Sequence, residues 1–406
     1  MAKNSEQLKR RSFLKWSAAG LAGMAANPIS ASQTGDSPAE TPHPQKKDVI
    51  VRTLGRTSLK LPVVSMGVMN SDNPNLIRAA LDRGIVMLDT AHGYQGGRNE
   101  VVIGGVIKGR PRDSFMIATK VPAPGRDRRS GAIPADAKAE PFFDMFNLSL
   151  RRLGLEHVEI LNQHNVLARD QVLFEPVLNA LQKIKKEGKA RFIGVTTHGN
   201  EPEVIRAVIE AKVHDVILTA YNFRQDHRDE VRKAVAEAAR AGIGIIAMKT
   251  QAGAYWDKEK QYPINMKAAL KWVLSDPNVT TAVPGLTTFD QLEEDLAVMT
   301  DLTLTEQELK DLKMDIHGGL YCQHCRRCLP GCREGLPVPD LMRGYMYAYG
   351  YRNMGLAHDL LQELDIPSNP CRSCETCTVS CAKGFDVAER IKDIVRLKDV
   401  PADFFA

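Results

Sequence analysis

Short apolar runs alternate with amphipathic stretches from residue 49 to about residue 300. Gly, Asp or Asn stands at many of the joins, as expected where buried strands give way to helices. The expected strands are Val63–Val68, Ile85–Ala91, Ser114–Lys120, Val158–Asn165, Arg191–Thr197, Val216–Asn222, Ile243–Lys249 and Val279–Gly285. The expected helices are Asn75–Arg83, Phe142–Leu153, Leu173–Lys186, Pro202–Lys212, Glu230–Ala241, Met266–Leu274 and Asp290–Met299. Eight such units in roughly 250 residues predict an α/β fold, a (β/α)8 TIM barrel.

A doubly wound parallel sheet is the main alternative for such an alternation. It is disfavoured because no G-x-G-x-x-G follows the first strand and because the repeat runs to eight units. A hairpin is expected before the barrel, over residues 49–64, with Gly55, Arg56 and Thr57 at its turn.

Four side chains suited to proton transfer follow or end consecutive predicted strands. They are Asp89, Tyr94, Lys120 and His164. In a barrel of this kind the carboxyl ends of the strands share one rim, so the four are expected to converge. A lysine beside a phenol lowers its pKa, a carboxylate holds the lysine, and an imidazole orients a substrate oxygen. Singly, each has an ordinary alternative, such as a helix cap or a solvated rim residue. Together they suit carbonyl reduction.

The ordered motifs of this region resemble those of the aldo-keto reductases. They read LDTAHGYQGGRNEVVIG, IATKV, EILNQHN, FIGVTTHGN, GIIAMKT and AALKWVLSDPNVTTAVPGL. The resemblance covers about residues 50–300. It implies that Tyr94 is the general acid and base, that Lys120 and Asp89 tune it, and that His164 orients the substrate.

The same resemblance implies a nicotinamide cofactor, NAD(H) or NADP(H), across the barrel mouth. The residues that it assigns to the cofactor are Thr196, Thr197, Met248, Lys249, Gly285, Thr287 and Gln291. NAD is favoured, because no Lys or Arg occurs between Asn278 and Lys310 to hold a 2′-phosphate. Asp290, Glu293, Glu294 and Asp295 add negative charge there instead.

All eight cysteines lie in two runs of the form C-x2-C-x2-C-x3-C near the C-terminus. The runs are Cys322, Cys325, Cys328 and Cys332, then Cys371, Cys374, Cys377 and Cys381. This spacing resembles the two-cluster bacterial ferredoxins, in which each [4Fe-4S] cluster takes three cysteines of one run and the last of the other. The resemblance implies two ligand sets that mix the runs. They are Cys322, Cys325, Cys328 and Cys381 for one cluster, and Cys371, Cys374, Cys377 and Cys332 for the other. Disulfides or zinc sites are the alternatives, and the close spacing favours neither.

The N-terminus resembles a twin-arginine export signal. RRSFLK precedes a short apolar run, Trp16 to Ala26, that is too short to span a bilayer. We therefore expect a signal peptide at 1–31, a linker at 32–48, passage through the twin-arginine translocase and a periplasmic location. Of the net charge of +5, +4 falls in residues 1–31, so the rest lacks the basic surplus of a nucleic-acid-binding protein.

These features together predict an exported oxidoreductase. The barrel (49–315) is expected to interconvert a carbonyl and an alcohol on a small carbonyl or sugar-like substrate. A small, mainly helical iron-sulfur domain (316–406) is expected to pass electrons to a redox partner protein through two [4Fe-4S] clusters. The alternative is an electron-transfer iron-sulfur protein that uses the barrel as a non-catalytic binding scaffold.

Overall fold

The computed structural model describes residues 48–127, 131–314 and 319–405. The expected signal peptide and nearly all of the expected linker therefore lie outside the described residues. The described residues belong to one compact unit that begins at Lys47. No helix in these ranges is long and apolar enough to cross a membrane.

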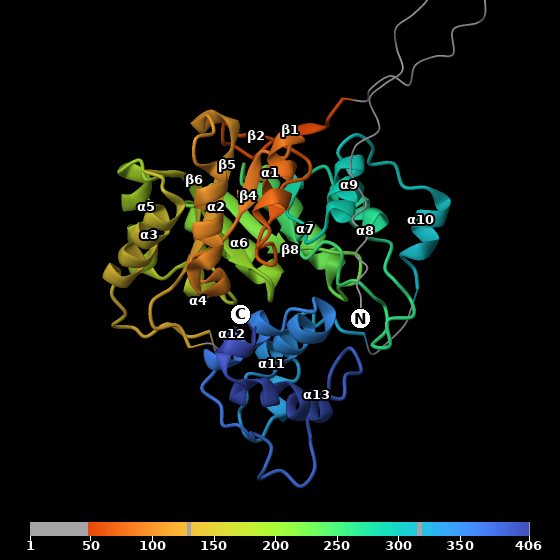
Figure 1. Cartoon of the computed structure of the whole chain (residues 1–406). Helices are drawn as coiled ribbons and strands as arrows, with labels where there is room; N and C mark the ends of the chain where they lie inside the picture. The colour runs from red at the N-terminus through yellow and green to blue at the C-terminus, as the bar shows by residue number, and fades with distance from the viewer. Residues whose placement is uncertain (1–47, 128–130, 315–318, 406) are drawn as a thin grey trace, which may run out of the picture. The chain divides into compact units, whose positions relative to one another are not determined.

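The eight predicted barrel strands form one parallel sheet that closes on itself (Figure 1). They are β3 (Met66–Gly67), β4 (Met87–Asp89), β5 (Met116–Pro122), β6 (Val158–His164), β7 (Ala190–Thr197), β8 (Val216–Ala220), β9 (Gly244–Met248) and β10 (Thr281–Ala282). Neighbours in the chain are neighbours in the sheet, from β3 to β10. Parallel bridges join Val64 to Ala282 and Gly67 to Gly285, which closes the ring. The (β/α)8 prediction is confirmed.

The predicted hairpin closes one end of the barrel. Strands β1 (Val51–Thr53) and β2 (Lys60–Pro62) pair antiparallel. The buried hairpin residues Leu54, Leu59 and Leu61 pack in one cluster with barrel-interior residues of several strands. Gly55 has φ +51, and a Cβ there would lie 2.3 Å from the backbone nitrogen of Gly244, so the turn needs glycine.

Helices surround the sheet, and seven of them fall where the hydrophobic periodicity predicts. They are α1 (Pro74–Asp82), α3 (Glu140–Leu153), α5 (Glu175–Lys186), α6 (Glu201–Ala211), α7 (Arg228–Arg240), α8 (Met266–Leu274) and α9 (Phe289–Val298). Helix α5 is typical: its buried residues are Val177, Ala180, Leu181 and Ile184, the i, i+3, i+4, i+7 pattern of one helical face.

The structure adds helix α2 (Arg98–Ile107), which the periodicity does not predict. Gly104 and Gly105 lower the helix propensity of this segment. Packing explains Gly104, because a Cβ at that position would lie 2.5 Å from the carbonyl oxygen of Arg152 in α3. The remaining short elements of the barrel are η1 (Tyr94–Gly97), η2 (Arg112–Ser114), α4 (Arg169–Val172) and α10 (Glu306–Asp311).

The C-terminal region is mainly helical, as expected. Its elements are η3 (Leu329–Gly331), α11 (Val338–Tyr345), the π-helical η4 (Met346–Gly350), α12 (Met354–Gln362), α13 (Val387–Ile394), η5 (Val395–Asp399) and η6 (Ala402–Phe405). The spacer between the cysteine runs thus contains two α-helices, α11 and α12, with the π-helical η4 between them. Its core includes barrel-loop residues such as Phe223 and Trp256, so the C-terminal region packs directly on the barrel.

Asp295 in α9 gives the barrel a pH-dependent stability. Its side chain is buried and Oδ2 has no hydrogen-bond partner. Burial, helped by Glu294, raises the pKa of Asp295 to about 8. The folded protein therefore keeps a proton that the unfolded chain releases near pH ~4, and stability is lost as the pH rises towards 8.

We predict that Asp295→Asn raises the Tm at pH 8 by about 3 °C or more, with a smaller gain at pH 5. Thermal unfolding at the two pH values measures this. Asp290→Asn, an exposed carboxylate on the same helix, is the control and should change the Tm little at either pH. Equal shifts for Asp295→Asn at pH 5 and 8 would contradict the burial argument.

Candidate active site

The four predicted catalytic side chains meet at the carboxyl ends of neighbouring strands. Asp89 ends β4, Lys120 lies near the end of β5, and His164 ends β6. The parallel register places Asp89 beside Ala118 and Pro122 beside His164, so all of these ends share one rim. Tyr94 begins the short helix η1 that follows β4.

Long-range hydrogen bonds hold the loop that carries Tyr94. Arg152 of α3 donates to the His92 carbonyl oxygen at 2.9 Å, and Gln95 donates to the Met69 carbonyl oxygen at 3.1 Å. Gln95, Gly96 and Gly97 all have positive φ, which lets the chain reverse sharply after Tyr94. A Cβ at Gly97 would collide with the Arg152 guanidinium, so this glycine also makes room for the anchor.

A buried ion pair lies beneath the phenol. The Lys120 ammonium donates to Asp89 Oδ2 at 2.8 Å and lies 4.8 Å from the centre of the Tyr94 ring. Burial disfavours the charged lysine, but Asp89 and Tyr94 outweigh it and hold the pKa of Lys120 above its ordinary value. Burial also raises the pKa of Asp89, against the opposing effect of Lys120.

The sequence predicted a lowered pKa for Tyr94, but the structure raises it above the ordinary value. Burial is the largest cause, and Asp89 adds to it. Lys120 and Arg343 act in the predicted direction, but they do not overcome burial. The phenol therefore keeps its proton at neutral pH, which suits a proton donor. The His164 ring meets the Tyr94 ring edge-on, with 5.8 Å between their centres.

A cavity of about 450 Å³ opens over these residues. Asp89, Tyr94, Lys120 and His164 all line it, as do six of the seven residues expected to hold a nucleotide: Thr196, Met248, Lys249, Gly285, Thr287 and Gln291. The seventh, Thr197, does not line it. Its side chain is fully buried and its hydroxyl donates to the Gly199 carbonyl oxygen.

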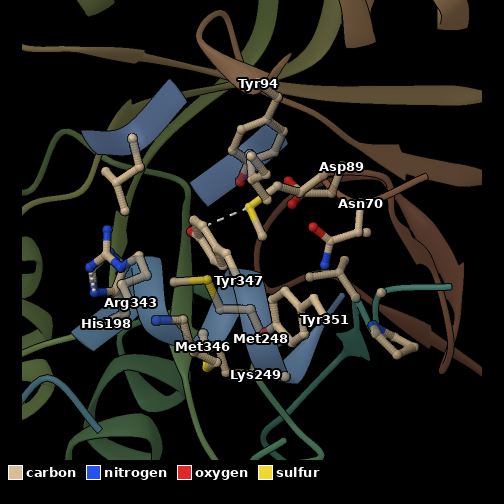
Figure 2. A pocket seen from close by; sticks show the side chains of 18 of the residues that line it. Asn70, Asp89, Tyr94, His198, Met248, Lys249, Arg343, Met346, Tyr347 and Tyr351 are labelled. Carbon is tan, nitrogen blue, oxygen red and sulfur yellow. Dashed lines mark hydrogen bonds between the residues drawn. The ribbon is translucent and has the colours of Figure 1, made fainter. Parts of the chain in front are cut away.

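The C-terminal region supplies one wall of this cavity, which the sequence did not predict. Arg343 comes from α11, Tyr347 from η4, and Tyr351 follows η4. The Tyr347 hydroxyl contacts the Met69 sulfur at 3.8 Å, and Figure 2 shows that hydroxyl turned towards Tyr94. A chain separation of about 250 residues explains why no local sequence pattern signals these contributions.

A buried cluster of charged and imidazole groups lies beside the cavity. Arg343 Nη2 lies 3.2 Å from a ring nitrogen of His198 and 3.1 Å from Nδ1 of His324. Burial, with the nearby cations, holds the pKa of both histidines well below the ordinary value. The His324 side chain is buried, with 4% of its surface exposed.

Lys249 stands next to this cluster. Its backbone is left-handed, with φ +55, which is uncommon outside glycine and marks a local strain. Burial and the Arg343 charge lower the pKa of Lys249 to about 7. Figure 2 shows the lysine on the side of the cavity where Arg343 and His198 lie.

The acidic segment near the expected 2′-phosphate position is less negative than its sequence suggests. Glu293 forms an exposed ion pair with Arg83 of α1. Asp295 is buried, with the raised pKa described above. Arg83 therefore places a cation close to this segment. It was not predicted from the sequence, because Arg83 lies far from residues 278–310 in the chain.

The eight cysteines are all free thiols, so no disulfide is formed. They gather in two sets that mix the two runs. Cys322, Cys325, Cys328 and Cys381 lie within electrostatic reach of one another. Cys332, Cys371, Cys374 and Cys377 line a second, small cavity.

No three or more His, Cys, Asp and Glu side chains among the described residues are close enough to hold a single metal ion. Four thiols around a cavity fit a group larger than one ion, and thiolates are the ligands that iron–sulfur clusters take. The residues present are thus of the right type and grouping for the expected clusters.

Trp256 packs inside the protein. It is 3% exposed, meets Phe223 edge-on at 5.6 Å and lies under the Arg224 guanidinium. Neither Trp256 nor Tyr255 lines the cavity over Tyr94. Trp256 therefore packs in the apolar core that the barrel loops share with the C-terminal region.

Comparison with known proteins identifies the family of the barrel. The profile of the aldo/keto reductase family matches residues 65–268. L-galactose dehydrogenase of Arabidopsis thaliana is 28% identical over 294 residues, which are 62% of this chain and 88% of the plant protein. L-glyceraldehyde 3-phosphate reductase of Escherichia coli K12 is 23% identical over 326 residues, 66% of this chain and 92% of that protein.

Solved structures agree on the fold. An aldo-keto reductase from Bacillus halodurans superposes with a TM-score of 0.53 at 22% identity. The match covers 66% of this chain and 96% of that one.

The buried Lys120–Asp89 pair predicts a pH-dependent loss of stability. Lys120→Met leaves Asp89 buried without its cation, which costs about 3 kcal/mol in the free energy of unfolding near neutral pH. The unpaired carboxyl then has a further raised pKa, so the loss should be larger at pH 8 than at pH 5. Urea denaturation at the two pH values measures it.

Lys189→Met is the matched control, since Lys189 forms an exposed pair with Glu187 at 3.2 Å. Such a pair contributes less than about 1 kcal/mol. The double variant Asp89→Asn/Lys120→Met should recover part of the loss. No recovery would mean that the pair is not the cause.

Proposed function

The chain belongs to the aldo/keto reductase family and is an oxidoreductase, and on this premise we propose that it interconverts a carbonyl and an alcohol at the barrel mouth, with Tyr94 as general acid and base. The observation that carries the proposal is the Tyr94–Lys120–Asp89 contact chain beneath the cavity, with His164 against the phenol. Acid–base catalysis requires a proton donor held within hydrogen-bond reach of the reacting oxygen, and these contacts hold the Tyr94 phenol at the cavity.

Each of the four residues has a distinct task in carbonyl reduction. Tyr94 holds the proton, because its raised pKa keeps the phenol neutral, and donates it to the carbonyl oxygen. Lys120 stabilises the phenolate that is left, and Asp89 keeps that lysine charged and in place. His164 hydrogen-bonds the substrate oxygen and turns the carbonyl towards Tyr94. Alcohol oxidation uses the same groups in reverse.

The cofactor is proposed to be NAD(H) or NADP(H). When bound, it supplies the hydride for the carbonyl carbon or accepts it from the alcohol. Thr196 and Met248 line the cavity near the catalytic residues, and Gly285, Thr287 and Gln291 line its other part. Gln291 has its side-chain oxygen fixed by the Thr287 backbone nitrogen at 2.8 Å, which leaves its amide NH2 for a ligand. NAD remains the favoured nucleotide. Arg83, which pairs with Glu293, weakens this preference because it places one cation near the expected 2′-phosphate position.

The two cysteine sets are proposed to hold two [4Fe-4S] clusters. Cys322, Cys325, Cys328 and Cys381 would bind one, and Cys371, Cys374, Cys377 and Cys332 the other. Clusters of this kind carry single electrons. The first set supports a link to the barrel, because Cys322 lies within electrostatic reach of Lys249, which lines the catalytic cavity. The second set includes the exposed Cys377, which suits contact with a redox partner protein.

A periplasmic location is proposed from the sequence alone. The twin-arginine-like RRSFLK would send the folded protein through its translocase. That route suits a protein that acquires its clusters before export.

We predict that Tyr94→Phe lowers kcat for aldehyde reduction by at least about 100-fold, because the proton donor is lost. Steady-state rates with a panel of aldehydes and ketones, with NADH and NADPH, measure it. Tyr262→Phe, an exposed tyrosine, is the control. If every substrate keeps its turnover in Tyr94→Phe, the catalytic proposal is wrong and the scaffold alternative gains support.

The cluster proposal predicts two unequal reduction potentials. Lys249, Arg343 and Arg390 lie near the first set and favour the reduced state, while Glu334 lies near Cys374 in the second set. Removing a negative charge near a cluster makes its reduction easier. Glu334→Gln should therefore raise the lower of the two potentials and leave the higher one unchanged.

Anaerobic redox titration followed by electron paramagnetic resonance measures both potentials. Glu306→Gln, an exposed carboxylate on α10, is the control and should move neither. Protein purified anaerobically without any iron–sulfur signal would end the cluster proposal.

A further inference from the structure

Two cations from distant parts of the chain meet on one wall of the catalytic cavity. Lys249 follows β9, and Arg343 comes from α11 of the C-terminal region. Both line the cavity, and Arg343 is the largest charged influence on Lys249. The Lys249 ammonium has no hydrogen bond or ion pair with any described residue. It is therefore open to a ligand.

Positive charges outnumber carboxylates around Arg343 and Lys249. Arg343 Nη2 faces two imidazoles, those of His198 and His324, and Arg343 Nη1 lies 3.4 Å from the Asp340 carboxylate. One carboxylate thus faces two cations. Of the other acidic groups within electrostatic reach of Lys249, Glu201 is engaged by His227 at 2.7 Å and by Gln225 at 3.0 Å, and Cys322 belongs to the first cysteine set.

A charge in a site shielded from water needs a counter-charge. Asp340 is the one carboxylate left to balance these two cations, and the Cys322 thiol also lies within electrostatic reach of them. Neither group contacts the Lys249 ammonium, so an anionic ligand in the cavity would complete its balance. Carboxylates fit guanidinium and ammonium groups especially well, through short, charge-assisted hydrogen bonds.

The position of the two cations relative to Tyr94 indicates which ligand is involved. Arg343 lies close enough to Tyr94 to lower its pKa, and Tyr347 stands beside both in Figure 2. One small molecule can then reach Tyr94 with its carbonyl and the two cations with its charge. A nucleotide diphosphate would be expected nearer to Thr287 and Gln291, among the residues that the family resemblance assigns to the nucleotide.

We propose that Lys249 and Arg343 form a subsite for the carboxylate of the substrate, and that the protein acts on small oxo acids or aldehyde acids and their alcohols. This assignment rests on the proposed carbonyl–alcohol function and moves Lys249 from the nucleotide to the substrate. It also gives the C-terminal region a part in substrate selection.

A matched pair of aldehydes tests the proposal in the intact holoprotein. The pair is 4-carboxybenzaldehyde and its neutral methyl ester, each reduced with NADH or NADPH. The wild type should prefer the acid by about 10-fold or more in kcat/KM. Lys249→Met and Arg343→Met should each lower kcat/KM for the acid by about 10-fold more than kcat/KM for the ester, which is the loss of one charged hydrogen bond. Arg343→Lys keeps the charge and should retain part of the preference.

Lys233→Met, an exposed lysine on α7, is the matched control and should behave as the wild type with both aldehydes. If Arg343→Met does not fold, Lys249→Met and Arg343→Lys carry the test. Calorimetric binding of 4-carboxybenzaldehyde, without any nucleotide, gives a readout that does not depend on turnover. Lys249→Met should weaken that binding about 10-fold.

The outcomes separate the subsite from the catalytic function. Binding of the acid that depends on Lys249, without reduction of either aldehyde, would support the subsite and overturn the function. Reduction of both aldehydes without preference for the acid would overturn the subsite and keep the function. Equal losses for acid and ester would also overturn it. Variants that weaken only the affinity for NADH or NADPH would also overturn the subsite, because they would assign the cations to the diphosphate. Variants that shift only a cluster potential would overturn it as well.

Discussion

A buried ammonium needs a carboxylate close by, and this need ties two barrel strands together at the catalytic rim. Lys120 on β5 meets Asp89 on β4 at 2.8 Å, with both side chains nearly inaccessible to water. The pair can form only because the parallel register sets the two strand ends side by side. Tyr94 then lies over the pair, and its proton affinity is set by burial on one side and by Lys120 on the other.

The C-terminal region contributes side chains to the catalytic cavity and also carries the cysteines. Its helix α11 brings Arg343 to the barrel, and η4 brings Tyr347. Asn222, two residues after β8, donates to the hydroxyl of Tyr321, and Tyr321 directly precedes Cys322. Asp226 of the barrel binds Lys383 and Gln323, which stand next to the two cysteine runs. The proposed cluster sites and the catalytic cavity therefore share one hydrogen-bonded interface.

The crossed cysteine sets follow from how the C-terminal helices pack. Helix α11 leads away from the first run and α13 follows the second, and the two helices pack against each other. This packing returns Cys381 to the first run and places Cys332 beside Cys371. Five of the cysteines pack against the apolar core of this region, so burial and any cluster would stabilise the same arrangement; they are Cys322, Cys328, Cys332, Cys371 and Cys381.

The order of the strands, most of the barrel helices, the hairpin and the residues at the strand ends could be predicted from the amino-acid sequence, because these depend on local periodicity and on short motifs. Helix α2 was not predicted because Gly104 and Gly105 lower its helix propensity, and of the two only Gly104 is required by packing. The raised pKa of Tyr94, the burial of Asp295 and His324, and the position of Arg343 in the cavity wall could not be predicted in this way. Each depends on desolvation or on contacts between residues far apart in the chain, and the local sequence carries no signal of either.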